Sequence, residues 1–259
     1  MSKLSIITIN YNNLEGLKKT MESVVNQTWR EFEYIIIDGS STDGSAAYIE
    51  SQRGKIDYWI SESDTGVYNA MNKGILKATG EYLLFLNSGD HLYSNTILQE
   101  NVKHLQNYDL IYFSIEVTGD NTSEIVSYPE KLRFSDFYYG TLCHQSTFIK
   151  TDLFGKFGLY DENLKIVSDW KFFILALFKY NCSYFKVDAI LATYYLDGIS
   201  SDVANIKVLY EERQEVFNSD FKGYIEDINQ LFELKTMALN LRKSRKIGLL
   251  VKLGLLNKF

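Results

Sequence analysis

The sequence predicts an α/β fold, with a mostly parallel sheet flanked by helices, a smaller mixed second half and C-terminal helices. The first observation behind this prediction is that strand-like apolar runs alternate with helical patterns over the first hundred residues. The second is that polar side chains follow four of these runs, as they do where parallel strands end at one edge of a sheet. The third is composition: 259 residues with 46% hydrophobic and 23% charged residues can bury one sizeable core.

Four strands and three helices are expected in the first half. Apolar and β-branched runs predict strands at residues 4–9, 34–37, 56–60 and 81–90. Apolar residues at helical spacing predict helices over residues 14–25, around residues 46–49 and over residues 67–78. Expected N-caps of these helices are Asn12 or Asn13, Asp43 and Thr65, in that order.

Beyond residue 90 the pattern becomes mixed. A helix around residues 97–105 precedes a strand at 110–117, and shorter aromatic-rich segments follow. A mostly buried helix is expected from Ser168 onward. Two strands, at 183–187 and 190–195, and then two longer helices are expected in the rest of the chain.

The most informative segment is an apolar run that is flanked by Gly80 and Gly89, and Asp90 follows it directly. Such a run is typical of a buried strand whose C-terminal end opens into a site, and open α/β sheets bind ligands outside these ends. Asp90 is therefore expected where a metal or a substrate binds. Asp38 follows three isoleucines in the same way, where a carboxylate can accept from a base N–H or a ribose hydroxyl.

The common phosphate-binding loops are absent from the sequence. There is no Gly-x-x-x-x-Gly-Lys-Ser/Thr, and no Gly-x-Gly-x-x-Gly follows the first strand, which disfavours nicotinamide cofactors and the usual nucleotide hydrolases. A diphosphate bound without such a loop needs another source of positive charge, and a divalent metal on a carboxylate supplies it. No nucleic-acid partner is expected.

Location is predicted from the cysteines and from the two ends of the chain. Cys143 and Cys182 have apolar or aromatic neighbours, typical of reduced thiols, and no secretory signal opens the sequence, so a cytoplasmic location is expected. Residues 235–259 contain seven Lys or Arg and no Asp or Glu, although the net charge of the chain is −6. Two interpretations stay open: a basic tail that contacts an anionic membrane, and an amphipathic helix that packs on its own domain.

A series of segments, in this order, resembles family 2 glycosyltransferases of the GT-A fold, in particular those that assemble bacterial surface polysaccharides. The matching segments of the first half are residues 4–12, 37–44, 64–75 and 78–90. Those of the second half are residues 143–148, 157–162, 168–173 and 198–201. The resemblance implies a glycosyltransferase domain over 1–200, with a nucleotide-sugar-binding half (1–100) and an acceptor-side half (101–200). Residues 201–259 lie outside the resemblance, and their pattern predicts a helical extension.

The activity that the resemblance implies is metal-dependent transfer of a sugar, with inversion at the anomeric carbon. The donor is a nucleotide-diphosphate sugar, usually a UDP-sugar, and the acceptor is a hydroxyl of a glycan or a lipid-linked intermediate. Mg or Mn is the implied cofactor. Together with the basic tail, this places the expected activity at the inner face of the membrane.

The resemblance also carries over residue by residue. Asp169 falls on the general base and Asp90 on the metal-binding aspartate; Asn87 and Gly89 stand where the family often has further acids. Tyr11 is implied to lie against the base, and Asp38 to contact the base or the ribose. The other implied donor-binding residues are Ile9, Asp64, Lys73, Asn87 and Ser88.

Three further expectations concern the second half. Burial beside Trp170 and Phe172 is expected to raise the pKa of Asp169, whose alternative role is helix capping. His144 and Gln145 are expected to hydrogen-bond the substrate or the residues that contact it. For His144 this role, or that of a buried histidine whose hydrogen bonds are satisfied within the protein, is favoured over proton transfer. Two other functions stay open: a sugar nucleotidyltransferase, which would need a basic glycine-rich loop that residues 9–13 lack, and a non-catalytic nucleotide-binding protein.

Overall fold

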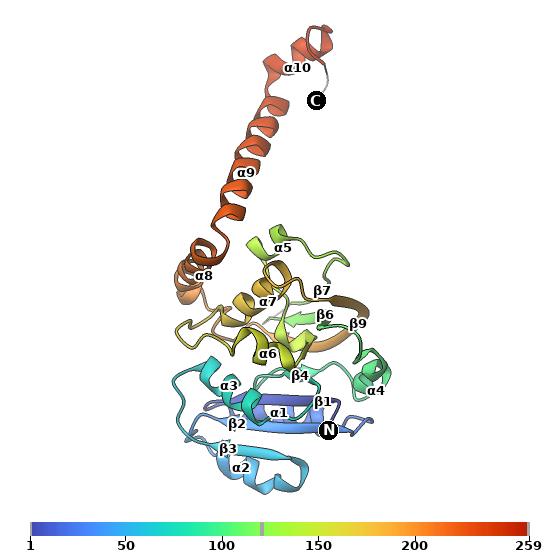
Figure 1. The fold of residues 1–259 in the computed structure, drawn as a ribbon, viewed down its shortest axis with the longest axis vertical. Helices are drawn as coiled ribbons and strands as arrows, with labels where there is room; N and C mark the ends of the chain where they lie inside the picture. Colours follow the sequence, from blue (N-terminus) through green and yellow to red (C-terminus); the bar gives the residue numbers. More distant parts are fainter. Residues whose placement is uncertain (1, 120–121, 258–259) are drawn as a thin grey trace. The chain divides into compact units, whose positions relative to one another are not determined.

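The computed structural model describes residues 2–119 and 122–257. The chain divides into two compact units, one up to Leu209 and one from Tyr210 onward. Within the described residues, the first unit is built on one nine-stranded mixed sheet with helices packed on it (Figure 1).

The strands are short in the first half and longest in the second. Their bounds are β1 Leu4–Asn10, β2 Phe32–Asp38, β3 Tyr58–Ser61, β4 Tyr82–Phe85, β5 His91–Leu92, β6 Leu110–Thr118, β7 Ser123–Val126, β8 Thr147–Lys150 and β9 Tyr184–Tyr195. The helices are α1 Leu14–Val25, α2 Ser45–Ser51, α3 Val67–Lys77, α4 Ile97–Asn101, α5 Phe134–Tyr139, α6 Asp152–Phe157, α7 Ser168–Phe178, α8 Ile206–Asp220, α9 Lys222–Lys243 and α10 Arg245–Lys252.

The order of the strands is β3-β2-β1-β4-β8-β6-β9-β5, and β7 pairs with β6. The strands β3, β2, β1 and β4 are parallel, so their carboxyl ends meet at one edge. From β8 onward the pairing becomes mixed, because β8 is antiparallel to both β4 and β6. The α/β fold class with a mixed second half is therefore confirmed.

Side chains that alternate along β1 face helices on opposite sides of the sheet. Leu4 and Ile6 share a hydrophobic core with Leu17 of α1. Ile7 faces α3, where a Cβ on Gly74 would lie only 2.5 Å from Ile7 Cγ2. Glycine therefore lets α3 pack closely on the sheet, which fixes the helix that carries Tyr68 near its start.

The helix starts differ in part from the expected caps. Asn13 caps α1 as predicted, with its side chain accepting from a first-turn backbone N–H. At α2 the N-cap position belongs to Gly44, while the Asp43 carboxylate accepts from the first helical N–H at 3.0 Å. The prediction for Thr65 is wrong: Gly66 stands at the N-cap of α3 with φ of 140°, a conformation that favours glycine.

Three other boundaries also differ from the prediction. β4 ends at Phe85, and the chain turns at Gly89, with φ of 114°, before it reaches Asp90. The two strands expected at 183–195 form the single strand β9, because a register shift against β6 absorbs the residues between Val187 and Ile190. The C-terminal part contains a third helix, since Ser244 interrupts the pattern and its side chain caps α10.

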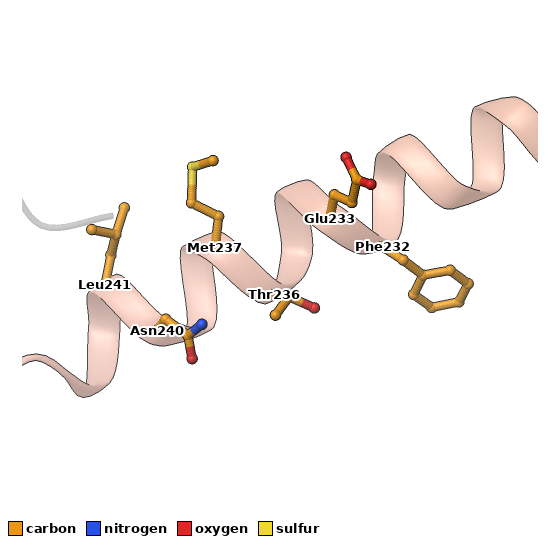
Figure 2. A pocket seen from close by; sticks show the side chains of 6 residues that line it. All are labelled: Phe232, Glu233, Thr236, Met237, Asn240 and Leu241. Carbon is orange, nitrogen blue, oxygen red and sulfur yellow. The ribbon is translucent and has the colours of Figure 1, made fainter.

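The second unit exposes many apolar side chains on its helices. Figure 2 shows six side chains of α9 that line a shallow hollow: Phe232, Glu233, Thr236, Met237, Asn240 and Leu241. All six come from one helix, so the hollow is a surface depression. Among the described residues, no helix combines the length and the apolar character needed to cross a membrane.

Candidate active site

Asp38 links the ends of three parallel strands through hydrogen bonds. Its carboxylate is fully buried and accepts from Asn10 Nδ2 at 2.7 Å, at the end of β1, and from Ser61 Oγ at 2.5 Å, at the end of β3. Ser41, in the loop after β2, donates to it from both its backbone N–H and its hydroxyl. These donors offset the cost of burying a charge and hold the edge of the sheet in one arrangement. A contact between Asp38 and a base or ribose stays a prediction.

Gly39 brings Tyr11 and Asp64 together beside this edge. A Cβ at Gly39 would lie 2.5 Å from Asp64 Oδ2 and 3.1 Å from Tyr11 Cδ2. Asp64 Oδ1 accepts from the Gly66 N–H, which fixes the carboxylate, while Tyr11 is 67% exposed. The result is an open aromatic ring next to an acceptor, which suits a flat ligand that stacks and donates an N–H.

Lys73 extends from α3 and already has partners in the protein. Its Nζ lies 2.9 Å from Glu62 Oε1 and 2.9 Å from the Ser63 carbonyl oxygen. These contacts hold the ammonium against the loop after β3. A donor-phosphate contact by Lys73 stays a prediction.

The segment after β4 runs beside β1 and then turns inward. The Ser88 N–H donates to the Ile9 carbonyl at 3.0 Å, and Gly89 then turns the chain. Thr20 of α1 fixes the turn, since its hydroxyl accepts from the Gly89 N–H at 2.9 Å and donates to the Asp90 carbonyl at 2.6 Å. The structure thus brings Ile9, Ser88 and Asp90 to one place.

Asp90 is a buried acid, only 5% exposed. Burial raises the pKa of its carboxyl to about 6, although Gln145 Nε2 donates to Oδ2 at 3.0 Å. Within the described part of the chain, no group of three or more His, Cys, Asp or Glu is placed to hold a metal. One carboxylate still fits a hard cation that arrives with a diphosphate, because Mg²⁺ is often held by one or two carboxylates together with substrate phosphates.

Asp169 lies at the start of α7 and accepts two hydrogen bonds from distant parts of the chain. Its Oδ2 lies 2.9 Å from His144 Nδ1, and its Oδ1 accepts from the Tyr68 hydroxyl at 2.9 Å. Val167 occupies the N-cap position of α7, and the Asp169 carboxylate also hydrogen-bonds the Trp170 backbone in the first turn of this helix. The other ring nitrogen of His144, Nε2, is 3.4 Å from Asn87 Nδ2, at the end of β4.

The predicted rise in the pKa of Asp169 is wrong. Burial by itself raises this pKa, but the hydrogen bond and the charge of His144, followed by the Tyr68 hydroxyl, more than reverse it, so the net pKa is lowered. The sequence indicated apolar neighbours and thus desolvation. It did not indicate the two donors, which stand 25 and 101 residues away along the chain.

The predicted residues therefore form two connected groups. Tyr11, Asp38, Asp64 and Lys73 surround the ends of β1–β3. A second group continues from the end of β4 to α7 and comprises Asn87, Asp90, Gln145, His144 and Asp169. Neither Thr20 nor Tyr68 was predicted from the sequence. Each contributes one hydroxyl from a helix face whose other residues are typical of a hydrophobic core.

Comparison with known proteins agrees with this architecture. The model of the family "Glycosyl transferase family 2" matches residues 5–164. An uncharacterized glycosyltransferase of Mycobacterium tuberculosis is 32% identical over 206 residues, which cover 76% of this chain and 77% of that protein. A Mycobacterium bovis protein named PGL/p-HBAD biosynthesis glycosyltransferase is 31% identical over 175 residues, which cover 65% of this chain and 67% of that protein.

Solved structures give the same result for the fold. S. aureus TarS 1-349 matches with a TM-score of 0.65 and 19% identity, over 85% of this chain and 66% of that chain. Its complex with UDP-GlcNAc also gives 0.65. The fold is thus similar to that of GT-A glycosyltransferases such as TarS. The chain belongs to glycosyl transferase family 2, and it is a glycosyltransferase.

Proposed function

We propose that this enzyme transfers a sugar from a UDP-sugar to an acceptor hydroxyl with inversion at the anomeric carbon. The observation that carries the proposal is the pair of acids Asp90 and Asp169, which are held by the consecutive residues Gln145 and His144. One acid lies at the sheet edge where α/β proteins bind ligands, and the other belongs to a network that can accept a proton. The UDP-GlcNAc complex of TarS supports the choice of donor.

The nucleotide is proposed to lie across the ends of β1–β3. Tyr11 stacks on the uracil ring, and Asp64 accepts a base N–H at the place that Gly39 leaves open. Asp38 contacts the base or the ribose directly, or it acts indirectly by holding in place the strand ends that make this contact. Ile9, Asn87 and Ser88 line the path toward the sugar, where the buried Asn87 Oδ1 has no hydrogen-bond partner among the residues that the structure describes and is available to a sugar hydroxyl.

The diphosphate is proposed to lie at Asp90, with Lys73 on the far side. Asp90 would hold the divalent cation, Mg or Mn, whose charge offsets the negative charge that develops on the leaving diphosphate. A metal on this carboxylate also explains why a costly buried acid is kept there. Because Asp90 is the sole acid of the motif, the donor phosphates would supply further ligands to such a cation.

Inversion needs one base on the face of the sugar opposite the diphosphate. The Asp169–His144 pair supplies it: the acceptor hydroxyl loses its proton to this pair while its oxygen forms the new bond to the anomeric carbon. The same step breaks the bond between that carbon and the diphosphate, which leaves with the electron pair.

The acceptor is proposed to be a glycan or a lipid-linked intermediate used in polysaccharide or glycoconjugate assembly. The name of the M. bovis relative supports a glycoconjugate role. The charge of α10 supports peripheral contact with a membrane, since Arg245, Lys246 and Lys252 share this helix with exposed Leu249. We place this contact at the cytoplasmic face.

Turnover of a panel of UDP-sugars with Mn, by the native chain and by Asp90→Ala, tests the function. We expect UDP release by the native chain and its loss in the variant. Turnover that depends on pyrophosphate would instead indicate a sugar nucleotidyltransferase, and donor binding without any turnover would indicate a nucleotide-binding protein.

A further inference from the structure

A cavity of about 400 Å³ lies beside the start of α3. It is lined by the first turn of α3, by the loop before α7 and by the segment that leads into α8. Its volume is at the lower end of the roughly 300–1,000 Å³ that is typical of small-molecule sites. Of the described residues that line it, none is a residue proposed to hold the nucleotide or the diphosphate. The cavity therefore has room for a second ligand.

Tyr68 connects this cavity to the proposed base. Its ring lines the cavity, while its hydroxyl donates to Asp169 Oδ1 at 2.9 Å. The other carboxylate oxygen, Oδ2, contacts His144, whose second ring nitrogen lies near Asn87 on the donor side. The two oxygens of the base are thus directed to different places, one toward the cavity and one toward the donor. An inverting transferase needs its base between the donor and the attacking hydroxyl.

The carboxylate of Asp169 can still be reached by a ligand. Its side chain is 16% exposed, and each oxygen has a second lone pair besides the one that accepts a hydrogen bond within the protein. We propose that the cavity binds the acceptor and holds the sugar residue whose hydroxyl attacks the donor. A sugar that lies along the Tyr68 ring presents this hydroxyl to Asp169. The inference rests on the proposed function and adds the place and the chemical class of the acceptor.

The lining of the cavity combines apolar and polar groups. Its apolar side chains are Val67, Tyr68, Leu164, Ile166, Ile199 and Val208. Asn69, Glu162 and Asn205 add amide and carboxylate groups that can hydrogen-bond sugar hydroxyls. Such a lining suits a sugar residue that carries an apolar substituent, such as the methyl group of a 6-deoxy sugar or of an acetamido sugar, because this group removes apolar area from water when it is buried.

Hydrogen bonds hold the walls of the cavity in place. Asn69 Nδ2 and Asn72 Nδ2, both on α3, donate to the two carboxylate oxygens of Glu162 at 2.9 and 2.8 Å. In the segment before α8, Asn205 Nδ2 donates to the Ile199 carbonyl oxygen at 3.0 Å. Because these bonds form within the protein, the cavity exists before a ligand binds, which lowers the entropic cost of binding.

Two substitutions fill the cavity, and a matched third one does not. Val208→Trp and Ile199→Trp each place an indole ring among the lining side chains. Val203→Trp is the control, because Val203 lies between them in the sequence, is 79% exposed and is not a lining residue. Ile199 is 57% exposed, so its substitution provides the test if Val208→Trp fails to fold. Thermal unfolding of each variant checks that it folds.

The probes are p-nitrophenyl glycosides of the gluco and galacto series, each as the parent sugar, the 6-deoxy sugar and the acetamido sugar. UDP release from a UDP-sugar with Mn gives the KM of each glycoside, and calorimetry gives the affinity for UDP. We expect the native chain to show a KM about fivefold lower for a 6-deoxy or acetamido sugar than for its parent, since one methyl group is buried. Equal KM values in both series would contradict the apolar class of acceptor.

We expect both Trp variants to raise the KM of the glycosides at least about tenfold, while the affinity for UDP changes less than about threefold and Val203→Trp behaves like the native chain. An unchanged KM in the folded Trp variants overturns the assignment. An equal loss of affinity for UDP also overturns it, because the cavity would then belong to the donor. The same holds if the native chain hydrolyses a UDP-sugar but no glycoside increases UDP release. If no donor yields UDP, with or without glycosides, the proposed function itself fails, and this inference fails with it.

Discussion

Gln145 Nε2 lies 3.0 Å from Asp90 Oδ2, and this hydrogen bond joins the turn before β8 to the loop after β4. The residue before Gln145 is His144, whose Nδ1 lies 2.9 Å from Asp169 Oδ2. One short 3₁₀ turn, His144–Ser146, therefore holds both acids of the site. The separation of Asp90 and Asp169 is consequently set by adjacent residues of the chain.

Replacement of Asp90 by Asn is expected to stabilise the protein near pH 8 while it abolishes turnover. The folded-state pKa is about 6, above the unfolded value of 3.8, so the stability that this carboxyl contributes is present below pH 3.8 and is lost as pH rises through 6. Asn stays neutral, and at about 1.4 kcal/mol per pKa unit the gain at pH 8 is about 3 kcal/mol. Urea unfolding at pH 8 and pH 4 measures it, and an equal gain at both values would contradict the explanation.

Tyr68→Phe is expected to destabilise the fold and to slow turnover. The Tyr68 hydroxyl donates to Asp169 Oδ1 and lies 2.5 Å from the Ile166 carbonyl oxygen, so its loss removes hydrogen bonding to two buried acceptors at a cost of about 1–3 kcal/mol. Because the pKa of Asp169 is lowered in the fold, the contribution of its charged form is present at neutral pH and is lost as the pH falls through the folded-state pKa. The cost should therefore be larger at pH 7 than in acid, in urea unfolding.

Tyr160→Phe is the matched control for this substitution. Its ring centroid lies 5.6 Å from that of Tyr68, but within the described part of the chain its buried hydroxyl has no hydrogen-bond partner. Removing an unpaired hydroxyl is expected to be neutral or stabilising. Equal destabilisation by the two substitutions would show that ring packing, and not the hydroxyl of Tyr68, is responsible.

Gly39→Ala is expected to weaken nucleotide binding about tenfold, or about 1.4 kcal/mol. The new Cβ would lie 2.5 Å from Asp64 Oδ2 and 3.1 Å from Tyr11 Cδ2, so both groups proposed to hold the base must shift. Gly54→Ala is the control, since a Cβ there has open space around it. Calorimetric titration with UDP compares the two, and unchanged affinity in Gly39→Ala would remove Tyr11 and Asp64 from the base site.

Replacement of Arg245, Lys246 and Lys252 by Gln is expected to reduce binding to vesicles that contain anionic lipid. Each cation contributes about 1 kcal/mol near such a surface, so the three together account for about a hundredfold change in partitioning. Sedimentation with anionic and with neutral vesicles measures this change in binding. Deletion of residues 242–259 is expected to reduce binding to the anionic vesicles further. Association that is unchanged by both alterations would contradict a membrane role for the tail and favour the packed-helix interpretation.

Local patterns sufficed to predict the first half of the fold and the position of its acids. The alternation of Leu4 to Ile9 and the helical spacing from Leu14 onward predicted β1 and α1, and the abrupt end of an apolar run indicated Asp90. The contacts of Asp169 were beyond such reasoning, because Tyr68 stands 101 residues away and only the tertiary structure joins them. Burial was foreseen there, but the direction of the pKa shift depends on donors that no local pattern specifies.

The boundaries that were predicted wrongly have a related cause. The sequence between Val187 and Ile190 reads as a break, yet β6 continues alongside and the ladder tolerates a bulge there. Likewise Gly66 replaces Thr65 at the start of α3, because the chain needs a backbone conformation that only glycine adopts readily. Neighbouring strands and backbone geometry decided these positions.

The anomeric configuration of the first product gives the most direct test of the central claim. Proton NMR of the sugar transferred or released from an α-linked UDP-sugar, recorded before mutarotation, reports it. We expect UDP release with a β-configured product from the native chain, and neither signal from Asp90→Ala or Asp169→Asn. An α-configured product, or no turnover of any UDP-sugar by the native chain, would contradict an inverting UDP-sugar transferase.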